Sequence, residues 1–253
     1  MNKMKKLIPA LCLLLVSATL LGTSTYAWFS MNTTVSVSSM QIKATASKNL
    51  LISGSNPDGS DKGEYKASLA LTTKNESLVP VSTANTTTPT FFKLKDTGSK
   101  MEADSAEYKD DTTFAAATAN DYVKETMYVK STGQDATNLK AKVSFTGGTE
   151  ALDPAIRIMF VVGSNAYVYA PVAGYTAGYK AIASLDESGK PVLTSTNVTI
   201  SNNDTAILSS LTADQAVKIE VYIWYEGQDA SCKSTNAVTL DNTVFTVEYS
   251  VNG

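Results

Sequence analysis

One short stretch of this chain has the residue types of a cation site. Positions 56–64 read Asn-Pro-Asp-Gly-Ser-Asp-Lys-Gly-Glu, and oxygen-bearing side chains recur at alternate positions, as in a calcium-binding loop. Lys62 occupies one of those alternate positions, however, and no glutamate stands where an EF-hand loop needs its bidentate ligand. We interpret this stretch as a surface turn and predict no metal site.

The composition removes most catalytic machinery. The chain has no histidine, which excludes a Ser-His-Asp triad, a Cys-His pair and every zinc site built on histidine. Serine and threonine are abundant, but none has an identifiable base beside it in the sequence. Hydrolysis by paired carboxylates stays possible in principle, without a motif to support it. We therefore predict no catalytic residues, no cofactor and no enzymatic activity.

A tyrosine-rich patch and one cysteine are the remaining candidates for chemistry. Tyr167, Tyr169, Tyr175 and Tyr179 surround a Pro-Val-Ala-Gly turn at 171–174. They could stack on sugars, pack across a subunit contact or form the half-buried end of a sheet. Cys232 is the second of two cysteines and would either be buried as a small hydrophobe or bridge two subunits.

The first 27 residues predict export. Lys3, Lys5 and Lys6 form a basic head, and an apolar run follows at 7–21, shorter than the roughly 20 residues of a membrane-spanning helix. Thr25 and Ala27 are small residues at positions −3 and −1 of a cleavage site before Trp28. We predict a cleaved signal peptide at 1–27 and a secreted protein, found in the extracellular matrix or on the cell surface. An uncleaved anchor is the alternative, and contact with the membrane would then run only through that signal peptide.

Cleavage would also remove Cys12, so the mature chain could form no internal disulfide. The formal net charge of −3 becomes more negative when the three lysines of the head are lost. Arg157 is the single arginine of the chain. Nucleic-acid binding is not expected of such a chain, because affinity for phosphates comes mainly from lysine and arginine.

The rest of the chain predicts an all-β protein. Alternating or continuous apolar segments indicate strands at 35–44, 50–53, 122–130, 139–145, 156–162, 166–170, 197–200, 217–225 and 244–251. Several of these strands have one apolar face and one polar face, which is typical of an antiparallel β-sandwich. Helix is expected to be minor, with a turn or two within 103–119 and one capped turn at 211–216.

Three blocks of the sequence resemble the TasA/camelysin-like proteins of Gram-positive bacteria. The first is Thr-Tyr-Ala-Trp-Phe-Ser at 25–30, followed by Val-Ser-Val at 35–37 and Met-Gln-Ile at 40–42. The second is the strand-turn-strand unit over 127–143. The third is Trp-Tyr-Glu-Gly-Gln-Asp-Ala-Ser-Cys at 224–232, which is similar to a block of clostridial members.

The resemblance implies a jelly-roll-like β-sandwich exported through a SipW-type signal peptidase. It further implies assembly into extracellular, biofilm-matrix fibres, in which the mature N-terminal strand of one subunit joins the sheet of the next. The donor-strand contacts would be Trp28, Phe29, Val35, Val37, Met40 and Ile42. Camelysin-like members have been described as metalloproteases, but that activity does not transfer to a chain without histidine or a zinc motif.

The sequence therefore predicts three regions: the signal peptide 1–27, a donor-strand segment 28–44 and a single β-sandwich domain 45–253. The leading hypothesis is a fibre subunit whose partner is a second copy or a paralogous subunit. A monomeric cell-surface adhesin or carbohydrate-binding module is the alternative, with Tyr167, Tyr169 and Tyr175 as its platform. A hydrolase with paired carboxylates is the third hypothesis.

Overall fold

The computed structural model describes residues 35–37, 40–47, 49–54, 64–72, 76–95, 113–146, 152–229, 231–232 and 240–252. These residues form an all-β protein without helix. The strands are β1 Val35–Val37, β2 Gln41–Ala46, β3 Leu50–Ser53, β4 Ser68–Thr72, β5 Glu76–Leu78, β6 Val81–Ser82, β7 Phe92–Leu94, β8 Phe114–Ala116, β9 Val123–Ser131, β10 Ala136–Thr146, β11 Ile156–Val162, β12 Asn165–Tyr169, β13 Ile182–Leu185, β14 Pro191–Leu193, β15 Ala206–Leu211, β16 Val217–Tyr225 and β17 Val244–Asn252.

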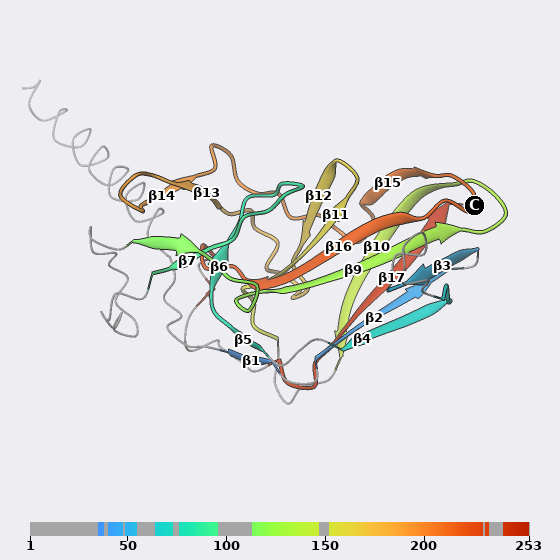
Figure 1. Cartoon of the computed structure of the whole chain (residues 1–253), viewed down its shortest axis with the longest axis horizontal. Coiled ribbons are helices and arrows are strands. Elements are labelled where there is room, and N and C mark those ends of the chain that lie inside the picture. Colours follow the sequence, from blue (N-terminus) through green and yellow to red (C-terminus); the bar gives the residue numbers. More distant parts are fainter. Residues whose placement is uncertain are drawn as a thin grey trace, which may run out of the picture.

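Two five-stranded sheets make the sandwich (Figure 1). One has the order β15-β10-β17-β2-β4, and the other has the order β12-β11-β16-β9-β3. The chain passes repeatedly from one sheet to the other, as in a jelly roll. All neighbours within these sheets are antiparallel except β2, which runs parallel to β17. The predicted β-sandwich is confirmed, with this one parallel pair as a departure.

The main core lies between the two sheets. Phe245 and Leu139 from the first sheet belong to the same buried cluster as Met127 and Phe160 from the second. Tyr249 joins the layers directly, because its hydroxyl donates to the Met127 sulfur at 3.7 Å and its ring lies 6.4 Å from that of Phe160. Burial of these apolar side chains is the main stabilisation available to a chain whose described cysteine is not in a disulfide.

A second layer covers the outer face of β11. Ile156, Ile158, Phe160 and Val162 point into the main core, whereas Met159 and Val161 belong to a second buried cluster with Trp224 of β16. Val81, Phe91, Tyr179 and Val198 close that cluster from segments outside the sandwich. Burial on both faces explains why 156–162 reads as an almost continuous apolar run instead of an alternating one.

Three small sheets lie outside the sandwich. β6, β7 and β8 form one, β13 and β14 form another, and β1 pairs with β5 in the third. In Figure 1 the β1–β5 pair lies below the sandwich, and β13–β14 lies at the upper left. Phe92, Phe114 and Ile182 pack together where the first two small sheets meet.

The long predicted strands are confirmed with small shifts at their ends, but the predicted strand 35–44 is divided into β1 and β2. At 197–200 there are only two isolated bridges, from Val198 to Tyr179 and from Ile200 to Val168. The short strands β4 to β8 and β13 to β15 were not predicted. They are too brief, or too rich in serine and alanine, to show a period of two.

The predicted minor helix is wrong wherever the structure describes it. Phe114–Ala116 is strand β8, because Phe114 is drawn into the cluster with Phe92 and Ile182. At 211–216 the chain leaves β15 through a turn in which Asp214 has a positive φ of 58°, a conformation that ends a helix. Within the described ranges, no helix has the length and apolar character needed to cross a membrane. The predicted signal peptide 1–27 lies outside these ranges.

Candidate functional site

The predicted donor segment is divided between two environments. Thr25, Ala27, Trp28 and Phe29 lie outside the described residues. Val35 and Val37 lie in β1, outside the sandwich. Met40 and Ile42, by contrast, are fully buried in the main core of the same chain.

Strand β2 explains the burial of Met40 and Ile42. It is an inner strand of the first sheet, parallel to β17 on one side and antiparallel to β4 on the other. Ile42 stands opposite Phe245 of β17 and Leu71 of β4. The predicted boundary after residue 44 therefore falls inside β2, and in the single chain Met40 and Ile42 fill this chain's own core.

The β1–β5 ladder is the described contact of the segment before Met40. Val35 pairs with Leu78, Ser36 with Ser77 and Val37 with Glu76, all antiparallel. Leu78 is fully buried in the main core, so β5 is fixed to the sandwich at one end. Residues 38 and 39 separate β1 from Met40, the core residue that directly precedes β2.

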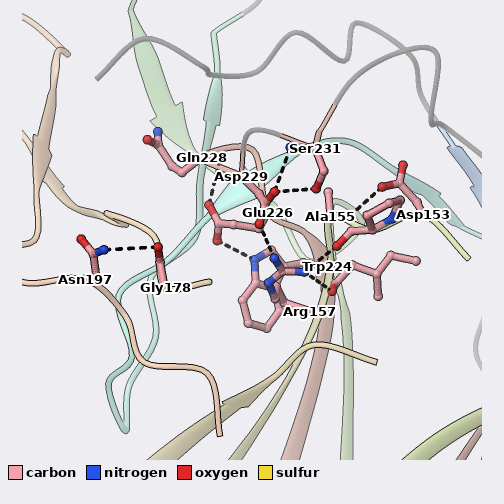
Figure 2. A network of polar contacts seen from close by, with 12 residues as sticks. Asp153, Ala155, Arg157, Gly178, Asn197, Trp224, Glu226, Gln228, Asp229 and Ser231 are labelled. Carbon is pink, nitrogen blue, oxygen red and sulfur yellow. Dashed lines mark hydrogen bonds and ion pairs between the residues drawn. The ribbon is translucent and has the colours of Figure 1, made fainter. Parts of the chain in front are cut away.

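Among the residues that the structure describes, the densest network of buried polar contacts lies around Arg157 of β11. We call Asp153, Arg157, Trp224, Glu226 and Asp229 the Arg157 cluster, and Figure 2 shows these side chains near one another. Arg157 lies at the start of β11 and Trp224 near the end of β16. The Arg157 guanidinium is fully buried and pairs with the Asp229 carboxylate. It also donates from Nη1 to the carbonyl oxygens of Pro154 and Ile156, both at 2.7 Å. The arginine thus fixes the entry to β11 and the loop after β16 at once.

Glu226 is the second buried ionisable group of the cluster. Its Oε2 accepts from the Trp224 indole N–H at 2.9 Å, and its Oε1 accepts from the backbone N–H of Gln228 at 3.0 Å. The backbone of the same loop bonds to two other segments, Glu226 N to the Ala155 oxygen and Gly227 N to the Val81 oxygen, both at 2.9 Å. Burial raises the pKa of Glu226 to about 7, although these hydrogen bonds and Arg157 favour its charged form.

Asp153 precedes β11 and completes the site. Its Oδ1 accepts from the Ala155 amide at 2.7 Å, which holds the turn before β11. Burial raises the pKa of Asp153 to about 6, and the negative charge of Asp229 acts in the same direction. Two carboxyl groups with raised pKa values are a common sign of acid–base catalysis, so this is the place to look for the hypothesised hydrolase.

Access argues against catalysis there. Asp153 is 1% exposed and Glu226 is not exposed at all, so no substrate atom reaches either carboxyl group without local opening. Cys232 is also buried, and burial raises the pKa of its thiol well above the usual value, which makes it a poor nucleophile. The hydrogen bonds of the Arg157 cluster and its loop instead join three backbone segments: the turn before β11, the loop after β16 and the chain at Val81. This arrangement stabilises the fold.

The four tyrosines do not form one platform. Tyr169 and Tyr179 are buried, in the main core and the second cluster respectively, and Tyr167 is half-buried against the main core. Only Tyr175 of the four is largely exposed, at 42%. Of the three interpretations of this patch, the structure favours the half-buried end of a sheet.

The other candidate sites among the described residues show no arrangement of catalytic or metal-binding groups. Of the predicted surface turn 56–64, only Glu64 is described, and it pairs with Lys66 at 2.9 Å. Within the described ranges, no three acidic, cysteine or histidine side chains come together as metal ligands. A hollow of about 250 Å³ lies beside Asn49, Gln134 and Asn252, without a buried charge in it.

Sequence reasoning missed the Arg157 cluster. One signal was available, because a lone arginine inside an apolar run must find a buried partner. The partners themselves, Asp229 and Glu226, follow β16 and come close to Arg157 only because β16 and β11 are neighbours. Comparison with protein-family models and with curated proteins gave no match to this chain.

Proposed function

We propose that the chain is a secreted, non-enzymatic structural subunit that polymerises into extracellular or biofilm-matrix fibres by donating its N-terminal strand. The observation that carries the proposal is the position of β1. This strand is hydrogen-bonded as a strand, lies outside both five-stranded sheets and directly precedes a fully anchored strand, β2. A short strand tethered to a stable domain is the part that strand donation requires.

The use of different surfaces for donor and acceptor supports open polymers. The donor segment leaves from the start of β2, and any acceptor is a different surface of the molecule. A contact between two different surfaces is head-to-tail, and such contacts yield filaments when the rotation between subunits does not close a ring. The partner is a second copy or a paralogous subunit, and a SipW-type signal peptidase would expose the new N-terminus at Trp28.

The test compares the mature chain 28–253 with a truncated chain 40–253. The truncation stops before Met40, because this residue is fully buried in the core and its loss would destabilise the domain. Both proteins are purified as monomers, concentrated and viewed by negative-stain electron microscopy. We expect filaments from the mature chain and folded monomers from the truncated chain.

Circular dichroism and thermal unfolding of 40–253 serve as the control for folding. Filaments of equal number and length from both chains would contradict strand donation. Persistent monomers from the mature chain at every concentration would contradict homopolymer formation and would direct the search to a paralogous partner or to the adhesin hypothesis.

A further inference from the structure

We infer that β5 is the acceptor: in the fibre, Glu76–Leu78 of one subunit pairs with Val35–Val37 of the neighbouring copy in place of its own β1. The inference rests on the proposed function and adds the identity of the acceptor strand. It comes from the β1–β5 ladder, in which the single chain already shows where its own N-terminal strand binds.

Both partners of the ladder are anchored independently of each other. On the acceptor side, Leu78 is fully buried in the main core, and Val81 shortly after it is fully buried in the second cluster. On the donor side, Met40 and Ile42 hold the start of β2 in the core. Release of β1 therefore leaves the sandwich intact, and an empty β5 keeps its position.

The ladder itself is short. It contains three residue pairs, and β1 and β5 form a two-stranded sheet with no third strand among the described residues. Isolated two-stranded ribbons are marginally stable in water, so β1 opens at low cost. The same three pairs form again when β1 of another copy arrives, which is the thermodynamic basis of strand exchange between identical subunits.

The donor strand and the core are close together in the sequence. Residues 38 and 39, both serine, are all that separates β1 from Met40. In the exchange, β1 leaves its own β5 and pairs with the β5 of another subunit, while Met40 stays in its own core. Each subunit then offers one donor and one acceptor, so exchange continues from copy to copy.

The register of the β1–β5 ladder identifies two positions for a cross-linking experiment. Ser36 stands directly opposite Ser77, so one subunit carrying Ser36→Cys is mixed with another carrying Ser77→Cys, both in a Cys232→Ala background. The mixture is assembled into fibres, oxidised and separated on a non-reducing denaturing gel. Neither chain can form this disulfide alone. Each variant is therefore also assembled and oxidised by itself, and a dimer band found only in the mixture is the heterodimer band that reports pairing between subunits.

A matched mixture uses Ser144→Cys and Thr246→Cys, which are opposite each other in β10 and β17. These strands lie inside the first sheet, so this mixture should give no heterodimer band. The chain with both Ser36→Cys and Ser77→Cys, oxidised as a monomer, should close an internal disulfide, form no fibres and recover fibre formation on reduction.

The outcomes separate the two proposals. A heterodimer band from Ser36→Cys with Ser77→Cys, and none from the matched mixture, is the expected result. Fibres without that band would overturn β5 as the acceptor and leave strand donation to another edge, such as β15. No fibres from the mature parent chain at any concentration would contradict homopolymer formation and would overturn this inference, which requires a second copy of the chain.

Discussion

The Trp224 indole donates a 2.9 Å hydrogen bond to the carboxylate of Glu226, two residues further along the chain, and neither side chain is exposed to solvent. Trp224 is the last residue but one of β16 and faces away from the main core, and its ring packs edge-on against Phe91 at 5.5 Å. Glu226 begins the loop that carries Asp229. This bond therefore joins the second apolar cluster to the Arg157 cluster, and the charge state of Glu226 affects both.

The first prediction concerns pH. The folded protein raises the pKa of Glu226 from 4.5 to about 7, so between these values the folded state holds a proton that the unfolded state has released. Stability is then greatest below pH 4.5 with respect to this group and declines as the pH rises toward 7, by about 3 kcal/mol at most. Asp153, raised from 3.8 to about 6, contributes with the same sign at lower pH. We expect Glu226→Gln to flatten the decline between pH 5 and 7.5 in urea unfolding.

Glu248→Gln is the control, since Glu248 is exposed on β17. Its pH profile should follow that of the parent chain. An unchanged profile in Glu226→Gln would show that the carboxyl group of Glu226 titrates alike in the folded and unfolded states, against the burial argument.

The second prediction concerns Arg157. Replacement by methionine keeps much of the volume but removes the charge, leaving Asp229 without its cation and the carbonyls of Pro154 and Ile156 without their donor. Breaking a buried pair on one side costs about 3–5 kcal/mol. Arg157→Lys should recover only part of this, because one ammonium group cannot reach all three oxygens in the geometry of the guanidinium fork. Urea unfolding at neutral pH measures both variants.

Lys218→Met provides the comparison, because Lys218 forms an exposed ion pair with Glu220. Exposed pairs contribute about 0–1 kcal/mol, so this variant should unfold close to the parent. If Arg157→Met were no less stable than Lys218→Met, the Arg157 cluster would not be the structural connection described above.

The long strands could be predicted because each carries its own periodic signal. β9, β10 and β17 largely alternate apolar and polar side chains over nine or more residues, and most buried positions follow that alternation. In β16 the alternation holds on the core face, but the second cluster also buries Tyr222 and Trp224 on the opposite face. The order of strands in the sheets carries no such signal. β2 pairs with β17 at the far end of the sequence, and nothing local in Gln41–Ala46 specifies that partner.

The Arg157 cluster could not be predicted for the same reason, since it depends on which strands are neighbours. Arg157 and Asp229 are 72 residues apart, and they meet because β11 and β16 are neighbours in register, with Ile156 opposite Tyr225. In the donor segment, by contrast, the local pattern is present but does not show where the strand ends. Its apolar residues at 35–42 predict a strand correctly, but the pattern does not show that the strand ends at Val37 and that Met40 already belongs to the core. Burial depends on tertiary neighbours, which the local pattern does not contain.

The third prediction separates the two halves of the donor segment. Ile42→Ala removes a fully buried side chain between β17 and β4 and should lower stability by about 2–5 kcal/mol. Val192→Ala, at a 46% exposed position of β14, is the matched apolar control and should stay within about 0.5 kcal/mol of the parent. Equal stability of the two variants would mean that β2 is not part of the core of the isolated subunit.

The last prediction concerns Cys232, for which burial and an intersubunit bridge were the alternatives. The side chain is 1% exposed, and burial raises the pKa of the thiol, so both access and thiolate formation are suppressed. We expect the native chain to react slowly with a thiol reagent such as Ellman's reagent and to react fully once guanidinium unfolds it. Ser209→Cys places a second thiol at an exposed position of β15 and should add one fast equivalent. Fast labelling of the parent chain at neutral pH would contradict burial of Cys232. Slow labelling, together with fibres that dissolve equally with and without reductant, would exclude Cys232 as a bridge between subunits.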